Sequence, residues 1–342
     1  MEQSVQNDTP QKLLEVKDLR VSFFTPAGEV KAVSGISYDL DYDEVMGIVG
    51  ESGSGKSQEA YSIMGLLQSP GKVIGGSITF EGRDVLSFGK NEMAAFRGSE
   101  VAMIFQNPMT CLNPVYTVGN QLIEALRAHD KKISKADAAQ RAMEMLELVG
   151  INNVQKRMKQ YPHEFSGGMR QRVMIAMGLI CHPKLLIADE PTTALDVTIQ
   201  AQILKLMNDL KREMGTSILF ITHDLGVIHE MADEVAVMYC GQIVEKAPAR
   251  TIFHDGTYSH PYTEGLMTSI PQLNTPKGEK LDAIPGSVPN PLYLPQGCKF
   301  APRCKYCTQK CQEAEPTLHE VEPGHVVRCF YPEKAVRKEH GE

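Results

Sequence analysis

The sequence contains no tryptophan, and aromatic residues make up only 6% of its 342 residues. It also lacks any run near the roughly 18 uninterrupted apolar residues that a membrane-spanning helix needs, so a membrane role would have to come through a partner. The polar N-terminus carries Glu2 and Asp8 and has no apolar stretch, which argues against a secretory signal. The formal net charge is −7, and this lack of a basic excess disfavours nucleic acid as a partner.

Alternating apolar and polar residues predict antiparallel strands near the N-terminus. Residues 14–23 and 30–40 both alternate, and a Thr-Pro-Ala-Gly turn separates them. Continuous apolar segments at 44–49, 184–188 and 217–221 are typical of strands buried in a parallel sheet. The sequence therefore predicts an α/β fold, in which a parallel α/β core carries an N-terminal antiparallel β subdomain.

Helical spacing of apolar residues predicts an insert within this core. It extends over residues 118–150 and resumes at 169–180, which together indicate a helical subdomain spanning about 107–180. After Tyr258 the composition of the sequence changes, because prolines recur and would interrupt any long helix or strand. We expect a separate, loop-rich C-terminal extension that packs outside the core.

A glycine-rich segment directly after the 44–49 strand matches the P-loop pattern G-x-x-x-x-G-K-S. It reads Gly50-Glu51-Ser52-Gly53-Ser54-Gly55-Lys56-Ser57. In such a loop the backbone N–H groups and the start of the following helix surround the β-phosphate of a nucleotide. Lys56 is expected to contact the β- and γ-phosphates, and the Ser57 hydroxyl is expected to ligate Mg²⁺.

Two acidic residues complete this site in sequence. Asp189 and Glu190 follow the 184–188 strand, at the carboxyl edge where open α/β sheets bind ligands. Asp189 is expected to hold Mg²⁺ through its water shell, and Glu190 is expected to polarise the attacking water. The P-loop and this acidic pair together predict ATP hydrolysis.

A segment upstream of the acidic pair resembles the signature sequence of ABC ATPases. It reads Phe165-Ser166-Gly167-Gly168-Met169-Arg170-Gln171-Arg172. The resemblance covers roughly residues 13–248 and implies roles for further residues. It makes Ala194-Leu195-Asp196 similar to the D-loop. It makes His223 similar to the switch histidine, and Gln106 similar to the Q-loop glutamine that also reaches Mg²⁺. Phe23 is placed like the aromatic residue that stacks on adenine, with Phe24 as the competing choice.

The same resemblance implies that the chain works as part of a dimer. In the family, two chains stack head to tail, and the signature of one chain closes on the γ-phosphate held by the P-loop of the other. A helix is expected to begin at Ser166, Gly167 and Gly168. The N-terminus of a helix binds anions, yet no phosphate-binding loop lies next to this one in the sequence. The implied cofactors are ATP and Mg²⁺, and the implied partner is a second ABC ATPase subunit, either a copy or a paralogue.

Two longer segments look like the oligopeptide and dipeptide importer ATPases within that family. They are Asn-Pro-Met-Thr-Cys-Leu-Asn-Pro at 107–114 and Tyr-Pro-His-Glu-Phe-Ser-Gly-Gly-Met-Arg-Gln-Arg at 161–172. Cys111 stands where a serine is usual, and it touches no phosphate ligand. This resemblance implies two transmembrane permease subunits, an extracytoplasmic peptide-binding protein, and a peripheral location on the cytoplasmic face of the inner membrane.

Of the 8 cysteines, those after Tyr258 crowd together: Cys298, Cys304, Cys307, Cys311 and Cys329. A nucleotide-binding chain without a signal is expected in a reducing compartment, where clustered cysteines favour metal over disulfides. The importer resemblance implies a 4Fe–4S cluster on four of them, namely Cys298, Cys304, Cys311 and Cys329. Four thiolates also suit zinc, and a metal-free extension stays open. Cys307 forms a local C-x-x-C with Cys304, so the choice of four ligands stays open too.

The predicted division of the chain has three parts: a disordered tail at 1–12, a nucleotide-binding domain at 13–257 and a C-terminal extension at 258–342. Two alternative functions remain at this point. One is a soluble ABC ATPase of DNA repair or translation, which a long coiled coil or a second ATPase domain would favour, and the sequence has neither. The other is an iron–sulfur redox protein whose ATPase drives electron transfer or cluster delivery.

Overall fold

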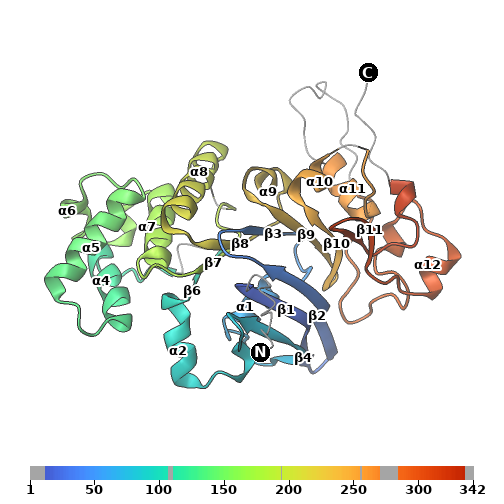
Figure 1. Cartoon of the computed structure of the whole chain (residues 1–342), viewed down its shortest axis with the longest axis horizontal. Coiled ribbons are helices and arrows are strands. Elements are labelled where there is room, and N and C mark those ends of the chain that lie inside the picture. The colour runs from blue at the N-terminus through green and yellow to red at the C-terminus, as the bar shows by residue number, and fades with distance from the viewer. Residues whose placement is uncertain (1–11, 107–110, 194, 255, 270–283, 336–342) are drawn as a thin grey trace, which may run out of the picture.

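A computed structural model of the protein describes residues 12–106, 111–193, 195–254, 256–269 and 284–335. Two β-sheets meet at the centre of the molecule, with a group of helices at one end and the C-terminal extension at the other (Figure 1). The predicted tail at 1–12 lies outside the described residues except for Lys12, and so do residues 107–110 of the importer-like segment and Ala194 of the D-loop.

The N-terminal antiparallel subdomain is confirmed as a four-stranded sheet in the order β2-β1-β4-β5. Its strands are β1 (Leu14–Thr25), β2 (Gly28–Leu40), β4 (Gly71–Phe80) and β5 (Arg83–Asp84). β1 and β2 form a hairpin that closes with Thr25 opposite Gly28. Leu14 and Val16 are fully buried while Glu15 between them is partly exposed, which is the alternation that predicted the strand.

The second sheet has eight strands in the order β11-β12-β10-β9-β3-β8-β7-β6. Their bounds are β3 (Val45–Val49), β6 (Val101–Ile104), β7 (Leu185–Asp189), β8 (Ser217–Thr222), β9 (Glu234–Tyr239), β10 (Gln242–Pro248), β11 (His319–Glu322) and β12 (His325–Val327). The strands from β9 to β6 in this order are parallel. β3, β7 and β8 are buried along their whole length, as continuous apolar segments predict.

Helices flank this sheet and form one end of the molecule. Their bounds are α1 (Lys56–Ile63), α2 (Lys90–Ser99), α4 (Val118–His129), α5 (Lys135–Leu148), α6 (Val154–Arg157), α7 (Gly167–Leu179), α8 (Val197–Met214), α9 (Leu225–Met231), α10 (Ala249–Phe253), α11 (Pro261–Thr268) and α12 (Gln309–Glu313). Short 3-10 helices are η1 (Val85–Ser87), η2 (Pro162–Glu164), η3 (Ala301–Arg303) and η4 (Pro332–Ala335). Helices α4 to α7 lie together, which is the predicted helical subdomain (Figure 1). Helices α4 and α5 begin at the side-chain caps Thr117 and Ser134.

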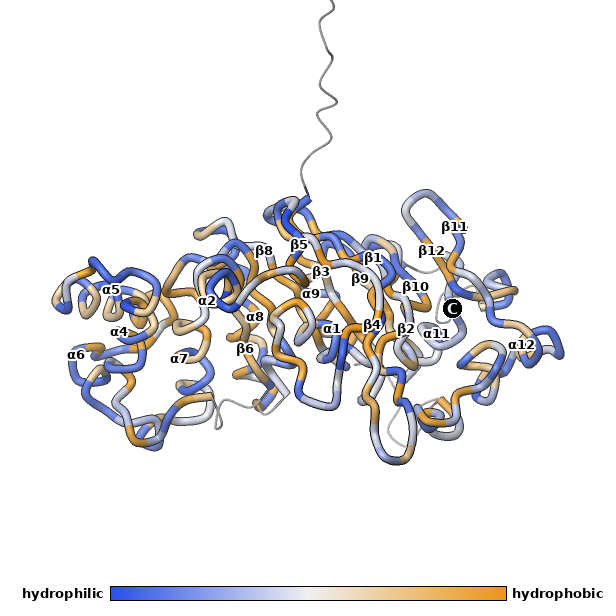
Figure 2. Tube along the Cα trace, turned by 90° about the horizontal axis from the view of Figure 1, so that it is seen from below, coloured by the Kyte–Doolittle hydropathy of each residue, from blue (hydrophilic) through white to orange (hydrophobic). Residues whose placement is uncertain are grey.

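The core consists of two clusters on opposite faces of the eight-stranded sheet. One cluster contains Met46, Ile48 and the buried residues of β1, β2 and α1, so it joins the two sheets. The other contains Val45 and Val49 of the same strand and the buried residues of α7, α8 and α9. Figure 2 shows the hydrophobic segments gathered along the central strands, while much of the α5–α6 end and of the α12 end is hydrophilic.

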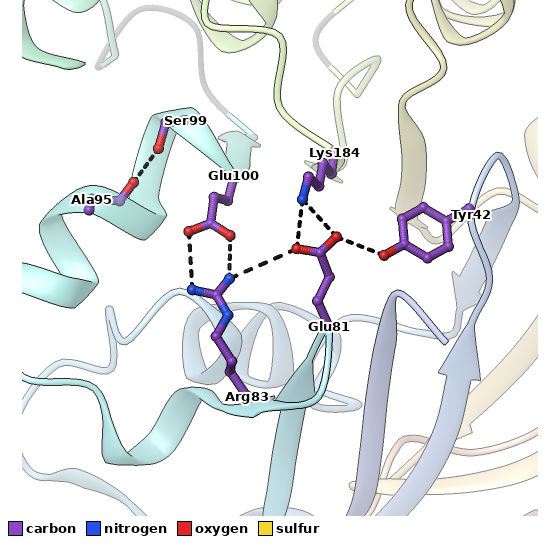
Figure 3. A network of polar contacts seen from close by, with 7 residues as sticks. All are labelled: Tyr42, Glu81, Arg83, Ala95, Ser99, Glu100 and Lys184. Atoms are coloured by element: carbon purple, nitrogen blue, oxygen red, sulfur yellow. Dashed lines mark hydrogen bonds and ion pairs between the residues drawn. The ribbon is translucent and has the colours of Figure 1, made fainter. Parts of the chain in front are cut away.

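A polar network fastens the antiparallel sheet to the rest of the protein, with Glu81 at its centre (Figure 3). Both carboxylate oxygens of Glu81 accept hydrogen bonds from the Lys184 ammonium at 2.7 Å, and one accepts the Tyr42 hydroxyl at 2.7 Å. Arg83 lies beside it and pairs with Glu100. Burial alone would raise the pKa of Glu81, but these donors outweigh burial and lower it.

The C-terminal extension differs from the expectation that it packs outside the core. β12 pairs with β10, with Val327 opposite Glu245, so β12 and β11 continue the eight-stranded sheet. His325 and Glu245 are both buried, and the His325 imidazole contacts the Glu245 carboxylate at 2.9 Å. β12 has only three residues, which is too short for a period-two pattern to stand out in the sequence.

Candidate functional site

The P-loop connects β3 to α1, and its backbone leaves no room for side chains at two glycines. Gly55 has φ 103°, in the left-handed region, and a Cβ there would lie 2.3 Å from the Ala32 carbonyl oxygen. A Cβ at Gly50 would lie 2.2 Å from the Met238 carbonyl oxygen. The loop therefore closes against neighbouring strands only because these positions are glycine.

The Lys56 side chain lies inside the P-loop. Its ammonium donates to the carbonyl oxygens of Gly50 at 2.6 Å and Glu51 at 3.1 Å. Burial lowers the pKa of Lys56, and the nearby Glu190 and Asp189 carboxylates oppose that shift. The ammonium is thus held where a phosphate group could replace the carbonyl oxygens as its partner.

Ser57 and Asp189 come together although they are far apart in sequence. The Ser57 hydroxyl donates to the Asp189 carboxylate at 3.0 Å, and Asp189 is 1% exposed at the end of β7. Burial raises the pKa of Asp189, while the hydrogen bond from Ser57 acts in the opposite direction. A hydroxyl and a carboxylate side by side form an oxygen donor set of the kind that Mg²⁺ takes at phosphate sites.

The Glu190 carboxylate contacts three other side chains. The Gln106 side-chain amide donates to its carboxylate at 2.8 Å and the Thr193 hydroxyl donates at 2.9 Å. The His223 imidazole lies 3.3 Å from the other carboxylate oxygen. Burial alone would raise the pKa of Glu190, but the Thr193 and His223 contacts outweigh burial and lower it, so the folded protein holds this side chain as a carboxylate.

Two features of this cluster were not predicted from the sequence. Thr193 was missed, although a hydroxyl three residues after a functional carboxylate is a recognisable signal. The backbone of Glu190 has φ 47°, in the left-handed region, which is unusual for a residue other than glycine. Strained backbone of this kind occurs where the surrounding structure fixes a side-chain direction, and here that direction is toward Gln106 and His223.

A cavity of about 810 Å³ runs from the P-loop to the β1–β2 hairpin. Its lining includes Phe23 of β1 together with Ser52, Gly53, Ser54, Gly55, Lys56, Ser57, Gln106 and Glu190. Phe23 borders the cavity, whereas Phe24 is 49% exposed and does not contribute to its lining, so the geometry favours Phe23 as the stacking residue. Residues of the C-terminal extension also line the cavity, which the sequence did not indicate.

Comparison with known proteins identifies the family of this site. A family model described as "ABC transporter" matches residues 33–193, and one described as "Oligopeptide/dipeptide transporter, C-terminal region" matches residues 244–311. The oligopeptide transport ATP-binding protein AppD of Bacillus subtilis is 54% identical over 94% of this chain and 97% of its own length. The oligopeptide transport ATP-binding protein OppD of Escherichia coli is 53% identical over 94% of this chain and 93% of its own length. The chain belongs to the ABC transporter ATPases.

Solved structures agree with this ABC fold. The dimeric post-hydrolysis state of an ATP-binding cassette bound to ADP and Pi matches 69% of this chain and 99% of its own with a TM-score of 0.62, at 24% identity. A cbiO1 protein from Clostridium perfringens, part of an ABC transporter complex, matches 71% of this chain and 91% of its own with a TM-score of 0.61, at 28% identity. The α/β class and the ATPase activity predicted from the motifs are therefore confirmed, and neither alternative function is favoured.

In this ABC ATPase the signature segment begins α7. Ser166 is the N-cap, and its hydroxyl accepts from the Met169 N–H at 3.4 Å. A Cβ added at Gly167 would meet nothing within 4 Å, while one at Gly168 would lie 2.9 Å from Ile199. Asp196 caps α8 by accepting from the Ile199 N–H at 3.0 Å. The cavity lined by the P-loop does not include Ser166, Gly167 or Gly168, so one chain does not bring its own signature to its own P-loop.

The cysteines of the extension gather around a second, small cavity. Its lining includes the sulfur-bearing residues Cys298, Cys304, Cys311 and Cys329 but not Cys307. Burial raises the pKa of Cys304 to about 12 and that of Cys329 to about 11, so these thiols are protonated when no metal holds them. Within the described residues, no group of three or more His, Cys, Asp or Glu side chains is arranged to hold a single metal ion.

None of the helices in the described part of the chain is both long enough and apolar enough to span a membrane.

Proposed function

We propose that the chain is an ATP-hydrolysing motor subunit of an oligopeptide or dipeptide importer. The observation that carries this proposal is its identity of more than half with oligopeptide transport ATP-binding proteins over nearly the whole chain, C-terminal extension included. The cluster of Lys56, Ser57, Asp189 and Glu190 around one cavity supports it, because these are the groups that phosphoryl transfer to water requires.

Each residue of the cluster has a distinct part in the proposed reaction. Lys56 exchanges its bonds to the P-loop carbonyl oxygens for bonds to the β- and γ-phosphates, where it offsets developing negative charge. Ser57 and Asp189 would hold Mg²⁺, which would supply positive charge beside the same phosphates. Glu190 accepts a proton from the attacking water, and His223 and Gln106 fix the direction of its carboxylate.

The proposal includes a second motor subunit, which supplies the missing signature. The N–H groups that open α7 can bind the γ-phosphate only when α7 belongs to the opposite chain. The division proposed for this chain is a nucleotide-binding domain at 13–257, with its helical subdomain at about 107–180, and an extension at 258–342. The motor pair would bind two permease subunits at the cytoplasmic face of the membrane, and an extracytoplasmic peptide-binding protein would deliver the solute.

Peptide uptake by cells tests this function. In a strain that lacks the gene for this chain, the wild-type chain should restore uptake of a radiolabelled tripeptide or tetrapeptide, and Lys56→Ala should not. The matched control is Lys205→Ala, which changes an exposed lysine of α8 that does not line the cavity and should restore uptake to near the wild-type level. Equal peptide uptake with and without the wild-type chain would reject the importer assignment.

We further propose that the four cavity-lining cysteines bind a 4Fe–4S cluster. A single zinc ion needs its sulfur ligands about 2.3 Å from one point. The described residues offer no such group, yet four thiols border one cavity. A cluster accommodates thiolates that lie further apart, since each binds a different iron atom. Each of the four thiols would lose its proton when it binds iron, because only the thiolate is a metal ligand.

Metal analysis of the anaerobically purified chain tests the cluster. The expected content is about four iron atoms and four sulfides per chain, with the broad visible absorption of thiolate-bound iron. Cys311→Ser should lose both the iron and the absorption, and Cys307→Ser should keep them because Cys307 does not line the cavity. Stoichiometric zinc without iron, or full iron content in Cys311→Ser, would reject this ligand set.

A further inference from the structure

One loop of the C-terminal extension borders the same cavity as the P-loop. Six of its residues line that cavity: Ser287, Val288, Pro289, Asn290, Pro291 and Leu294. We call this segment the 287–294 loop. The motifs that mark the ATPase all lie before residue 248, so this contact joins a separate part of the chain to the nucleotide site.

Several contacts fix the 287–294 loop in this position. Val288 and Leu294 pack against the hydrophobic core. The side-chain oxygen of Asn290 accepts a hydrogen bond from the Leu292 N–H at 2.9 Å. The backbone carbonyl oxygen of Asn290 accepts a hydrogen bond from the Tyr293 N–H at 2.8 Å. These bonds form a tight turn that follows Pro289 and contains Pro291, and a turn of this kind has few alternative conformations.

The loop lies against the β1–β2 hairpin. Leu292 is the nearest neighbour of the hairpin turn, since a Cβ added at Gly28 would lie 3.5 Å from its side chain. The same hairpin carries Phe23 and Val30, which also line the cavity. The loop and the hairpin therefore both contribute walls to the cavity that the P-loop lines.

The chemistry of these walls suits a flat, largely apolar group. Phe23 and Val30 on the hairpin and Val288, Pro289 and Pro291 on the loop present aromatic and aliphatic surface. Such surfaces bind planar rings by dispersion and by removal of apolar area from water. The phosphate chain is different, because it needs the backbone N–H groups of the P-loop and the Lys56 ammonium.

We propose that the 287–294 loop is a specific binding element for the nucleoside end of ATP, so that the C-terminal extension completes the nucleotide site of its own chain. This inference rests on the proposed function, namely that the cavity binds ATP. It assigns the extension a part in nucleotide affinity that is separate from its cysteine site.

A comparison of two ligands tests the loop directly. MgATP carries a nucleoside, and magnesium tripolyphosphate carries the same phosphate chain without one. Calorimetric titration of the full-length chain should show that Pro289→Gly/Pro291→Gly weakens MgATP binding roughly tenfold, because glycines let the loop sample conformations that leave the cavity open. The affinity for magnesium tripolyphosphate should stay within about twofold of wild type, since this ligand has no nucleoside for the loop to contact. Asn290→Ala removes the side-chain hydrogen bond of the turn. This variant should also weaken MgATP binding and leave the affinity for magnesium tripolyphosphate nearly unchanged.

The matched control is Tyr293→Ala, in the same loop. Tyr293 is 77% exposed and does not line the cavity, so both affinities should remain at the wild-type value. Wild-type MgATP affinity in both loosened-loop variants would overturn the inference, and so would equal losses for MgATP and tripolyphosphate. Failure of the proposed function has a different outcome, in which the wild-type chain binds neither ligand or Lys56→Ala binds both unchanged.

Discussion

At the scale of single residues, the surroundings of Glu190 fix both the charge and the direction of its carboxylate. It is half-buried, it receives hydrogen bonds from Gln106 and Thr193, and it contacts His223. Burial by itself would favour the protonated form, and the donors reverse that preference by lowering the pKa. The result is a charged group with a fixed direction beside the cavity that would hold the γ-phosphate.

Glu190→Gln should separate ATP binding from hydrolysis. The amide keeps the size and most contacts of the carboxylate but cannot accept a proton, so we expect hydrolysis to fall by about a hundredfold or more. ATP affinity should change little, and the ATP-bound dimer should accumulate. Glu213→Gln, an exposed glutamate in α8, is the control and should behave like wild type. Loss of ATP affinity as steep as the loss of turnover would mean that Glu190 is a binding residue.

Glu59 is a second carboxyl group with an unusual environment. It lies on α1 directly after the P-loop, is completely buried, and lies near the Tyr38 hydroxyl. Burial raises its pKa from 4.5 to about 8, so the folded protein keeps this carboxyl protonated at neutral pH. In the unfolded chain the same group ionises above its ordinary pKa.

Stability should therefore decline with rising pH in a window that Glu59 sets. Below pH 4.5 the carboxyl is protonated in both the folded and the unfolded protein, so its contribution to the free energy of unfolding is fully present. That contribution falls as the pH rises and is lost by about pH 8. Each pH unit in the window costs about 1.4 kcal/mol of unfolding free energy. Glu59→Gln cannot ionise, so the variant should gain stability over wild type as the pH rises from 5 to 8 in denaturant unfolding. The exposed control Glu29→Gln should show no such gain. A constant difference between Glu59→Gln and wild type across this range would contradict the account.

At the scale of elements, the sequence predicts those parts whose pattern is local. The buried parallel strands, the β1–β2 hairpin and α7 follow from apolar periodicity and caps within a few residues. The position of the 287–294 loop does not, because its prolines only exclude regular structure and its contact with the β1–β2 hairpin depends on the whole fold. The partners of Glu190 were individually predicted from motifs, apart from Thr193, while their distances required the structure.

A buried ion pair connects the extension to the P-loop. The Arg303 guanidinium donates to both carboxylate oxygens of Glu51, at 2.6 and 3.1 Å, and to the Pro285 carbonyl oxygen at 2.9 Å. The Tyr262 hydroxyl, also in the extension, accepts the backbone N–H of Glu51 at 2.8 Å. One P-loop residue is thus held by its side chain and by its backbone from the same part of the chain.

Arg303→Met should loosen this connection. The substitution keeps apolar bulk but removes the two hydrogen bonds to Glu51 and the one to the Pro285 carbonyl oxygen, so we expect unfolding free energy to fall by about 1.5–3 kcal/mol. Lys305→Met is the matched control, because Lys305 pairs with Glu264 at an exposed site and should cost less than about 1 kcal/mol. Denaturant unfolding of the two variants decides the point, and equal losses would show that the Arg303–Glu51 pair contributes no more than a surface ion pair.

At the scale of the whole molecule, one chain holds two halves of different ATP sites. The P-loop cavity lies on the central sheet, and the signature begins α7 beside the helical subdomain. Because the N-terminus of α7 does not border the cavity of its own chain, the proposed complete site takes its signature from a second chain.

Ser166→Arg tests this arrangement. The bulky cation at the start of α7 should damage the site built on the partner's P-loop while the P-loop of the mutant chain stays occupied. Crosslinking of an ATP analogue to each subunit, measured separately, reads out the two sites. Ser134→Arg is the matched control, since Ser134 caps α5 in the same way without belonging to the signature, and it should leave both sites intact. Loss confined to the mutant's own P-loop would contradict a composite site.

ATP turnover by the purified membrane complex, assembled with either the wild-type or the Lys56→Ala chain, tests the central claim most directly. The claim is that this chain is an ATP-driven motor whose P-loop lysine stabilises charge on the transferred phosphate. The account predicts that the wild-type complex hydrolyses ATP and that Lys56→Ala abolishes turnover, with the complex still assembled. Near-normal ATP turnover by the Lys56→Ala complex would contradict it.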